Sequence, residues 1–236
     1  MKTGDKISSK NASWSFKGKV FKNFDKHINK SVPLYNECRE LYLYLTDYFL
    51  LDKSRIIDLG CSTGTFLKEI YRRHRNNNKK LSFEGYDTVK EMINFSKIKN
   101  KKNKVKFFIK DINKVNFLNS CIVSSFYTIQ FVPTSKRQNL INKIFKGLNW
   151  GGAFFMIEKV RGPDARFQDY ITQFYNDYKT SKGFSDDEIL SKSRSLKSVL
   201  EPFSHKGNMD MLKRAGFKDI MTVFKYGCFE GYLAIK

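Results

Sequence analysis

The loop at residues 58–64, with the sequence DLGCSTG, has the residue types and spacing needed to hold a small ligand. It follows a short apolar segment typical of a strand and leads into a segment typical of a helix. Gly60 and Gly64 let the backbone turn tightly and approach a ligand, and the start of the helix offers free N–H donors. The spacing is not G-x-G-x-x-G, which disfavours pyrophosphate binding. The alternative is an ordinary glycine-rich turn.

Two aspartates stand where the next two predicted strands end. Asp87 closes the segment EGYD, and Asp111 follows Lys110 after the third apolar run. A carboxylate such as that of Asp87 can accept hydrogen bonds from both hydroxyls of a ribose, and such charge-assisted bonds are strong. Either aspartate alone would more often cap a helix or lie in a solvated turn. Their placement at consecutive strand ends predicts a nucleoside site.

These residues need an alternating order of strands and helices to bring them together. The periodicity predicts strands over 55–59, 81–86, 105–109, 122–126, 153–158, 220–225 and 229–235. It predicts helices over 34–50, 65–74, 90–98, 135–148, 164–180, 186–197 and 208–215. Gly151 and Gly152 are expected to close the helix at 135–148, and Gly216 to end the last one.

This order predicts an α/β protein with a mostly parallel, seven-stranded, doubly wound sheet and one antiparallel strand at or near its edge. The layout resembles the Rossmann-like class I methyltransferases, whose ligands lie at the carboxyl ends of the strands. We expect residues 1–30 to form a tail and an N-terminal helical lid. Residues 31–236 then form the ligand-binding domain.

The D-x-G-x-x-x-G form of the loop resembles the first motif of S-adenosylmethionine enzymes. In that family the loop holds the methionine and ribose parts of the cofactor, and an aspartate such as Asp111, with Ile112, contacts adenine. The sulfonium is a cation and favours aromatic faces, for which Tyr35, Phe126 and Tyr127 are candidates, with core packing as the alternative. The expected cofactor-binding residues are Tyr35, Asp58, Gly60, Cys61, Ser62, Gly64, Asp87, Met92, Asp111, Ile112 and Phe126.

Longer segments are similar to one subfamily, the carboxy-S-adenosyl-L-methionine synthases, and they span nearly the whole chain in order. The most specific are the S-V-P-x-Y segment at 31–35 and the pair formed by Gln130-Phe131 and Arg137-Gln138. The others are WSF at 14–16, DLGCS at 58–62, IFKGLN at 144–149, GG at 151–152, EK at 158–159, DYK at 177–179, GFS at 183–185, EI at 188–189 and AGF at 215–217.

The resemblance implies that S-adenosylmethionine and prephenate become carboxy-S-adenosylmethionine and phenylpyruvate. The product would serve a partner enzyme that modifies the wobble uridine of tRNA, and the enzyme would be a homodimer. Tyr35 and Phe126 match positions beside the reacting sulfonium, so both are expected to be catalytic. The family tends to have an asparagine at the position of Phe126.

One further departure concerns the new carboxylate. The family pairs it with an arginine, and an ungapped match places Met211 there. Losing a bidentate partner is not a conservative change. Lys206, Lys213 and Arg214 are the neighbouring cations that could replace it.

Composition limits the classes of protein that the chain can represent. The 236 residues are 41% hydrophobic, with 22 Phe and 12 Tyr, which indicates a folded domain. No apolar run approaches the roughly 20 residues that span a bilayer, and the first ten residues lack the apolar part of a secretory signal. The cysteines and histidines are scattered, so we expect no metal site, no disulfide framework and a cytoplasmic protein.

The net charge of +21 indicates a surface that could attract a polyanion. Basic clusters at 72–80 and 97–106 could bind RNA phosphates. The same lysines also fit an AT-rich genome, in which Lys, Asn, Ile, Phe and Tyr are all frequent. Direct tRNA binding is therefore not the favoured interpretation.

Two other functions stay open at this stage. An ordinary S-adenosylmethionine-dependent methyltransferase acting on a small molecule or RNA needs the same loop, and Met211 is no objection to it. A non-catalytic RNA- or protein-binding module would fit the charge, but the intact Asp58, Gly60, Asp87 and Asp111 disfavour it.

Overall fold

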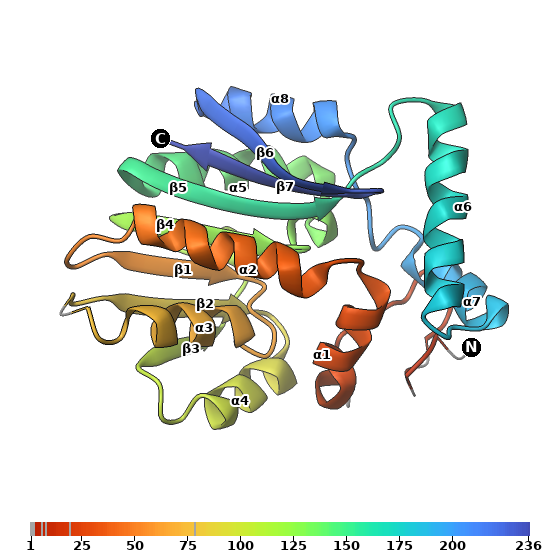
Figure 1. Cartoon of the computed structure of the whole chain (residues 1–236), viewed down its shortest axis with the longest axis horizontal. Coiled ribbons are helices and arrows are strands. Elements are labelled where there is room, and N and C mark those ends of the chain that lie inside the picture. The colour runs from red at the N-terminus through yellow and green to blue at the C-terminus, as the bar shows by residue number, and fades with distance from the viewer. Residues whose placement is uncertain (1–2, 6, 8, 19, 78) are drawn as a thin grey trace.

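Seven strands form one sheet in the order β3-β2-β1-β4-β5-β7-β6 (Figure 1). The structure is a computed structural model that describes residues 3–5, 7, 9–18, 20–77 and 79–236. The first five strands run parallel, and β7 runs antiparallel to both β5 and β6. The strands are β1 Arg55–Leu59, β2 Ser82–Asp87, β3 Val105–Ile109, β4 Ser120–Phe126, β5 Leu148–Lys159, β6 Asp219–Tyr226 and β7 Phe229–Ile235.

Helices cover both faces of the sheet, because its central strands are apolar on both sides. Successive residues of a strand point to opposite faces. Ile56 therefore joins one buried cluster and Ile57 the other, and Phe155 and Phe154 divide in the same way. The helices are α1 Val20–Ser31, α2 Tyr35–Leu45, α3 Thr65–His74, α4 Lys90–Lys99, α5 Thr134–Gly147, α6 Ala165–Ser181, α7 Asp186–Leu196 and α8 His205–Ala215.

Three helices stand beyond the carboxyl ends of the strands rather than on a face of the sheet. Figure 1 shows α1, α6 and α7 together on that side of the molecule. Backbone bonds tie the N-terminal segment to α7, since Ala12 and Trp14 donate to the carbonyls of Arg194 and Ser195 at 3.0 Å each. The Tyr175 hydroxyl of α6 donates to the Ser31 carbonyl of α1 at 2.8 Å. None of the helices within the described ranges is long and apolar enough to cross a membrane.

The predicted fold class is confirmed, including the seven-stranded, mostly parallel sheet and the antiparallel strand near its edge. Several predicted boundaries are wrong, among them the start of β5, at Leu148 instead of residue 153, and that of α8, at His205 instead of residue 208. The helix expected over 34–50 ends at Leu45, and a 3₁₀ turn covers Thr46–Tyr48. The helix expected to close at Gly151 ends at Gly147, because β5 already begins at Leu148 and pairs there with Ser120 of β4.

A buried arginine holds the segment after β4 in place. Arg137 of α5 is 2% exposed and donates to the backbone carbonyls of Val132, Gln130 and Glu201 at 2.8, 3.0 and 2.7 Å. Glu201 lies in the connection to α8, so one side chain joins two loops that are distant in sequence. Buried carbonyls need such donors. The hydrogen bond from Arg137 to the Gln130 carbonyl gives a structural reason for the paired Gln130-Phe131 and Arg137-Gln138 segments of the sequence.

We expect Arg137→Met to lower the free energy of unfolding by at least about 3 kcal/mol, because three carbonyls lose their donor and each costs about 1–3 kcal/mol. Urea denaturation measures the change. Lys146→Met, at an exposed position of the same helix, is the control and should stay within about 0.5 kcal/mol of wild type. Equal stability of the two variants would contradict the anchoring role.

Candidate functional site

A cavity of about 1190 Å³ opens where the parallel strands end. The loops after β1, β2, β3 and β4 form one wall, and α1, α6 and α7 form the other. Typical small-molecule sites occupy about 300–1,000 Å³. The cavity is therefore large enough for a nucleoside cofactor and a second small molecule together.

The loop after β1 is shaped by left-handed backbone conformations. Gly60 has φ +66°, and a Cβ there would lie 2.1 Å from Oγ1 of Thr128. Gly64 has φ +72°, and a Cβ would lie 2.5 Å from the Phe107 ring. Ser62, with φ +49°, adopts the same region without being glycine. Gly60 and Ser62 line the cavity, whereas Gly64 is the N-cap residue of α3 and does not line it.

Asp87 connects this loop to the end of β2. Its Oδ2 accepts the backbone N–H of Ser62 at 3.0 Å, and its Oδ1 accepts that of Val89 at 2.9 Å. Burial raises the pKa of Asp87, while these backbone hydrogen bonds oppose the shift. The carboxylate lines the cavity with one bond on each oxygen, which leaves further lone pairs for ligand hydroxyls.

Asp111 and Ile112 lie at the end of β3, on the same cavity wall. Asn113 donates two hydrogen bonds to Asp111, both to Oδ1 and both at 2.9 Å. These bonds lower the pKa of Asp111 and keep it ionised. Met92 of α4 also lines the cavity and accepts the Ser62 hydroxyl on its sulfur at 3.5 Å.

Asp58 and Cys61 lie beneath the loop and are not part of the cavity lining. Asp58 is 5% exposed and accepts the Ser124 hydroxyl at 2.7 Å. Burial raises its pKa to about 7, against that hydrogen bond. Cys61 is 6% exposed and packs against Gly85, where a Cβ would lie 2.8 Å from its sulfur. Both residues support the loop from behind.

The three aromatic residues expected near a sulfonium lie in two layers. Phe126 and Tyr127 line the cavity, and Tyr127 has φ +56°. Tyr35 does not line the cavity, and its ring lies 5.9 Å from that of Tyr127. Arg39 stacks over Tyr35 at 5.1 Å. Burial raises the pKa of Tyr35 to about 12, so its hydroxyl stays protonated.

The expectation that Met211 faces a carboxylate is wrong. Met211 is 1% exposed and belongs to the core cluster beneath α5 and α8, so it does not line the cavity. Lys206 is exposed and pairs with Asp210 at 2.5 Å, and the Arg214 guanidinium donates to Gln138 at 2.9 Å. An apolar side chain at this buried helix position is a packing residue, and its sequence distance from A-G-F was no guide to the site.

The N-terminal helix is fastened to the cofactor side of the cavity. Asp25 of α1 accepts the Thr63 hydroxyl on Oδ1 and the Lys99 ammonium on Oδ2, both at 2.7 Å. The backbone N–H of Gly18 donates to Glu91 of α4 at 3.1 Å. These contacts hold α1 over the loop after β1, in the position of a lid.

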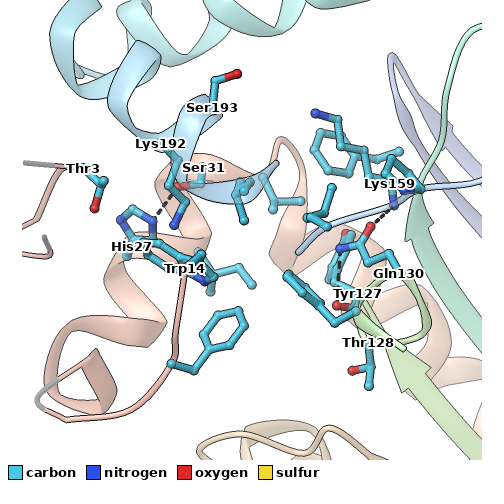
Figure 2. A pocket seen from close by; sticks show the side chains of 18 of the residues that line it. Thr3, Trp14, His27, Ser31, Tyr127, Thr128, Gln130, Lys159, Lys192 and Ser193 are labelled. Carbon is cyan, nitrogen blue, oxygen red and sulfur yellow. Dashed lines mark hydrogen bonds between the residues drawn. The ribbon is translucent and has the colours of Figure 1, made fainter. Parts of the chain in front are cut away.

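Sequence reasoning missed the residues on the far wall. Trp14, His27, Lys159, Lys179 and Lys192 all line the cavity, and they come from the N-terminal segment, α1, β5, α6 and α7. Figure 2 shows Lys192 beside Trp14 and His27, with Lys159 next to Gln130 on another part of the wall. Trp14, Lys159 and Lys179 lie within segments that carried the family resemblance. That was the one available signal, since no local motif joins them.

Comparison with known proteins fits this geometry. Residues 56–152 match the family model of a methyltransferase domain. A carboxy-S-adenosyl-L-methionine synthase of Staphylococcus epidermidis is 34% identical over 227 residues, which cover 94% of this chain and 97% of that protein. One of Nautilia profundicola is 36% identical over 98% of this chain and 99% of its own. The chain belongs to the carboxy-S-adenosyl-L-methionine synthase family. It is an S-adenosylmethionine-dependent transferase.

Solved structures agree on the fold at low sequence identity. The plantazolicin methyltransferase BpumL matches with a TM-score of 0.64 at 14% identity, over 91% of this chain and 90% of that one. Human N-acetylserotonin methyltransferase, solved with S-adenosylmethionine, matches with a TM-score of 0.63 at 15% identity, over 92% of this chain and 55% of its own. These similarities support the class I methyltransferase fold.

We expect Asp87→Ala to weaken binding of S-adenosylmethionine at least tenfold. Hydrogen bonds to a charged group contribute about 1.5–3 kcal/mol each, and about 1.4 kcal/mol is tenfold in affinity. Calorimetric titration measures the dissociation constant, and circular dichroism checks that the variant is folded. Asp219→Ala, at an exposed strand end, is the control. Equal affinity of wild type and Asp87→Ala would remove Asp87 from the site.

Proposed function

We propose that the protein is a carboxy-S-adenosyl-L-methionine synthase that uses prephenate. The observation that carries the proposal is the identity of 34–36% with synthases of this name, extending over at least 94% of both chains. The cavity supports it, because one wall offers nucleoside-binding carboxylates and the opposite wall offers cations. An enzyme that joins a nucleoside cofactor to an anionic substrate needs both.

The residues at the strand ends fit S-adenosylmethionine. In this proposal Asp87 accepts the ribose hydroxyls, and Asp111 receives the adenine amino group on Oδ2, which Asn113 leaves free of its two bonds. Gly60 and Ser62 bring the backbone close to the methionine part. Met92, Ile112 and Phe126 supply apolar contacts around the cofactor.

The proposed reaction balances in atoms and charge. S-adenosylmethionine and prephenate give carboxy-S-adenosylmethionine, phenylpyruvate and water. The methyl carbon loses a proton and gains the carboxyl group, and the hydroxide that leaves prephenate takes that proton. The lid excludes bulk water while the carboxyl group moves, because Asp25 holds α1 against Thr63 and Lys99.

Tyr35 and Phe126 have distinct parts in the proposal. Phe126 lines the cavity and presents an aromatic face to the sulfonium. Tyr35 keeps its phenolic proton, because burial raises its pKa to about 12. Its hydroxyl can therefore donate to the new carboxylate once the Tyr127 ring beside it gives access.

Self-association is also proposed, on the basis of one exposed helix face. Phe167, Tyr170 and Phe174 of α6 are 51%, 65% and 39% exposed, and their spacing places them on one side of the helix. Exposed aromatic groups of this kind are typical of protein interfaces. A second copy of the chain is the proposed occupant of this face.

The carboxylated product would leave for a tRNA-modifying enzyme in the cytosol, where the four free cysteines stay reduced.

Incubation with S-adenosylmethionine and prephenate should yield phenylpyruvate and a cofactor heavier by one carboxyl group, because the two substrates occupy adjoining parts of one cavity. Mass spectrometry of the cofactor and absorbance of phenylpyruvate follow the reaction. Asp87→Ala serves as the control and should slow it. Prephenate that stays intact while methyl groups move to another acceptor would instead establish an ordinary methyltransferase.

A further inference from the structure

Three lysines from separate elements line the same cavity, two of them beside Tyr175 and the third beside Trp14. Lys159 and Lys179 each place an ammonium group 4.4 Å from the centre of the Tyr175 ring, so the two lie at most twice that distance apart. Lys192 lies over the Trp14 ring. All three side chains are half-buried and line the cavity, and they come from β5, α6 and α7.

The charges of these lysines are not balanced by ion pairs among the described residues. Within the described part of the chain, no carboxylate forms an ion pair with any of the three lysines. The carboxylates of Asp177, Asp186 and Glu188 also line the cavity but pair with none of the three. Burial raises the pKa of both Tyr175 and Cys228, and burial together with the charge of Lys192 lowers the pKa of His27. Asp5, the carboxylate beyond His27, is already bonded to His27 at 2.7 Å.

Burial and neighbouring cations lower the pKa values of all three lysines. Burial lowers the pKa of Lys179 to about 8, and the charge of Lys159 adds to the effect. Burial also lowers the pKa of Lys192, and Lys179 contributes. Burial also lowers the pKa of Lys159; Cys228 opposes this shift, and the nearby Lys197 and Arg161 add to it. Unpaired cations in a half-buried site are costly, and a bound anion would relieve this cost.

The surrounding walls restrict the kind of anion. Ile171, Phe184 and Phe229 line the same region and are apolar. Inorganic anions would make no apolar contact with these three side chains. A compact organic frame carrying two carboxylates would use both the apolar walls and the separated ammonium groups. Such a ligand matches cations that enter from three different elements.

The geometry points to Lys159, Lys179 and Lys192 as the binding site for the two carboxylates of the second substrate. This assignment deepens the proposed function and rests on it for the identity of that substrate. Lys159 and Lys179 hold one carboxylate between them across Tyr175, and Lys192 holds the other on the Trp14 side. The cluster therefore selects dicarboxylates over monocarboxylates of the same size.

The lysine cluster also favours release of the product. The substrate carries two negative charges, and phenylpyruvate carries one. The second carboxyl group ends on the cofactor, at the other side of the cavity. The lysine cluster therefore holds the product less tightly than the substrate, which clears the site after each turnover.

The test is binding rather than turnover. Prephenate and phenylpyruvate are titrated calorimetrically into protein saturated with S-adenosylhomocysteine, which has no methyl group to react. Prephenate should bind at least about tenfold more tightly than phenylpyruvate. Lys159→Met, Lys179→Met and Lys192→Met should each weaken prephenate about tenfold or more, as expected for loss of a charge-assisted hydrogen bond.

Matched measurements separate this role from a structural one. Lys182→Met changes an exposed lysine directly after α6 and should leave both affinities within about twofold. S-adenosylhomocysteine affinity should be unchanged in all variants. Because an unpaired half-buried cation is removed, the melting temperature of the three variants should rise or stay level. A fall in melting temperature with unchanged prephenate affinity would overturn the assignment.

The two proposals fail in different ways. Turnover of prephenate by wild type with an unaltered KM in the Lys159→Met/Lys179→Met variant would overturn the lysine site and leave the proposed function standing. Lysine-dependent binding of prephenate without formation of phenylpyruvate would support the lysine site and overturn the proposed reaction.

Discussion

The hydrogen bond from the Ser62 N–H to Asp87 joins the ends of two neighbouring parallel strands, and the cofactor side of the cavity depends on it. Parallel strands end at the same edge of a sheet, so β1 and β2 deliver their loops side by side. Asp87 then fixes the left-handed turn at Ser62, and Gly60 fits under Thr128 only because it has no side chain. The carboxylate that can bind a ribose is thus also the group that shapes the loop around it.

The sequence predicts well those features of the fold that depend on residues close together in the chain. The alternation of strands and helices and the loop at Asp58–Gly64 depend on short-range periodicity and turn chemistry, and the structure has them as predicted. The Leu34–Leu50 helix was too long because periodicity continues into the 3₁₀ turn after Leu45, where backbone geometry changes without a change of residue type.

The far wall of the cavity could not be predicted in this way. Lys159, Lys179 and Lys192 are far apart in sequence and line one cavity because the end of β5, α6 and α7 all contribute to its wall. Met211 shows the converse problem. Its place near the A-G-F segment suggested a functional position, yet Met211 belongs to the core cluster that also contains Leu212 and apolar residues of α5. Spacing alone does not say whether a helix position faces the core or a ligand.

Closure and charge are linked in this cavity. Asp25 holds α1 on the cofactor loop, while Tyr175 ties α6 to the end of the same helix through Ser31. The ammonium groups of Lys159 and Lys179 lie against the Tyr175 ring. The helix α6, which closes the cavity, is therefore in contact with two of the lysines that lack a bound anion. An anion bound there would reduce the repulsion among the lysines and thereby favour the closed arrangement of α6 and α1. Substrate charge would then help to assemble the site in which the cofactor reacts.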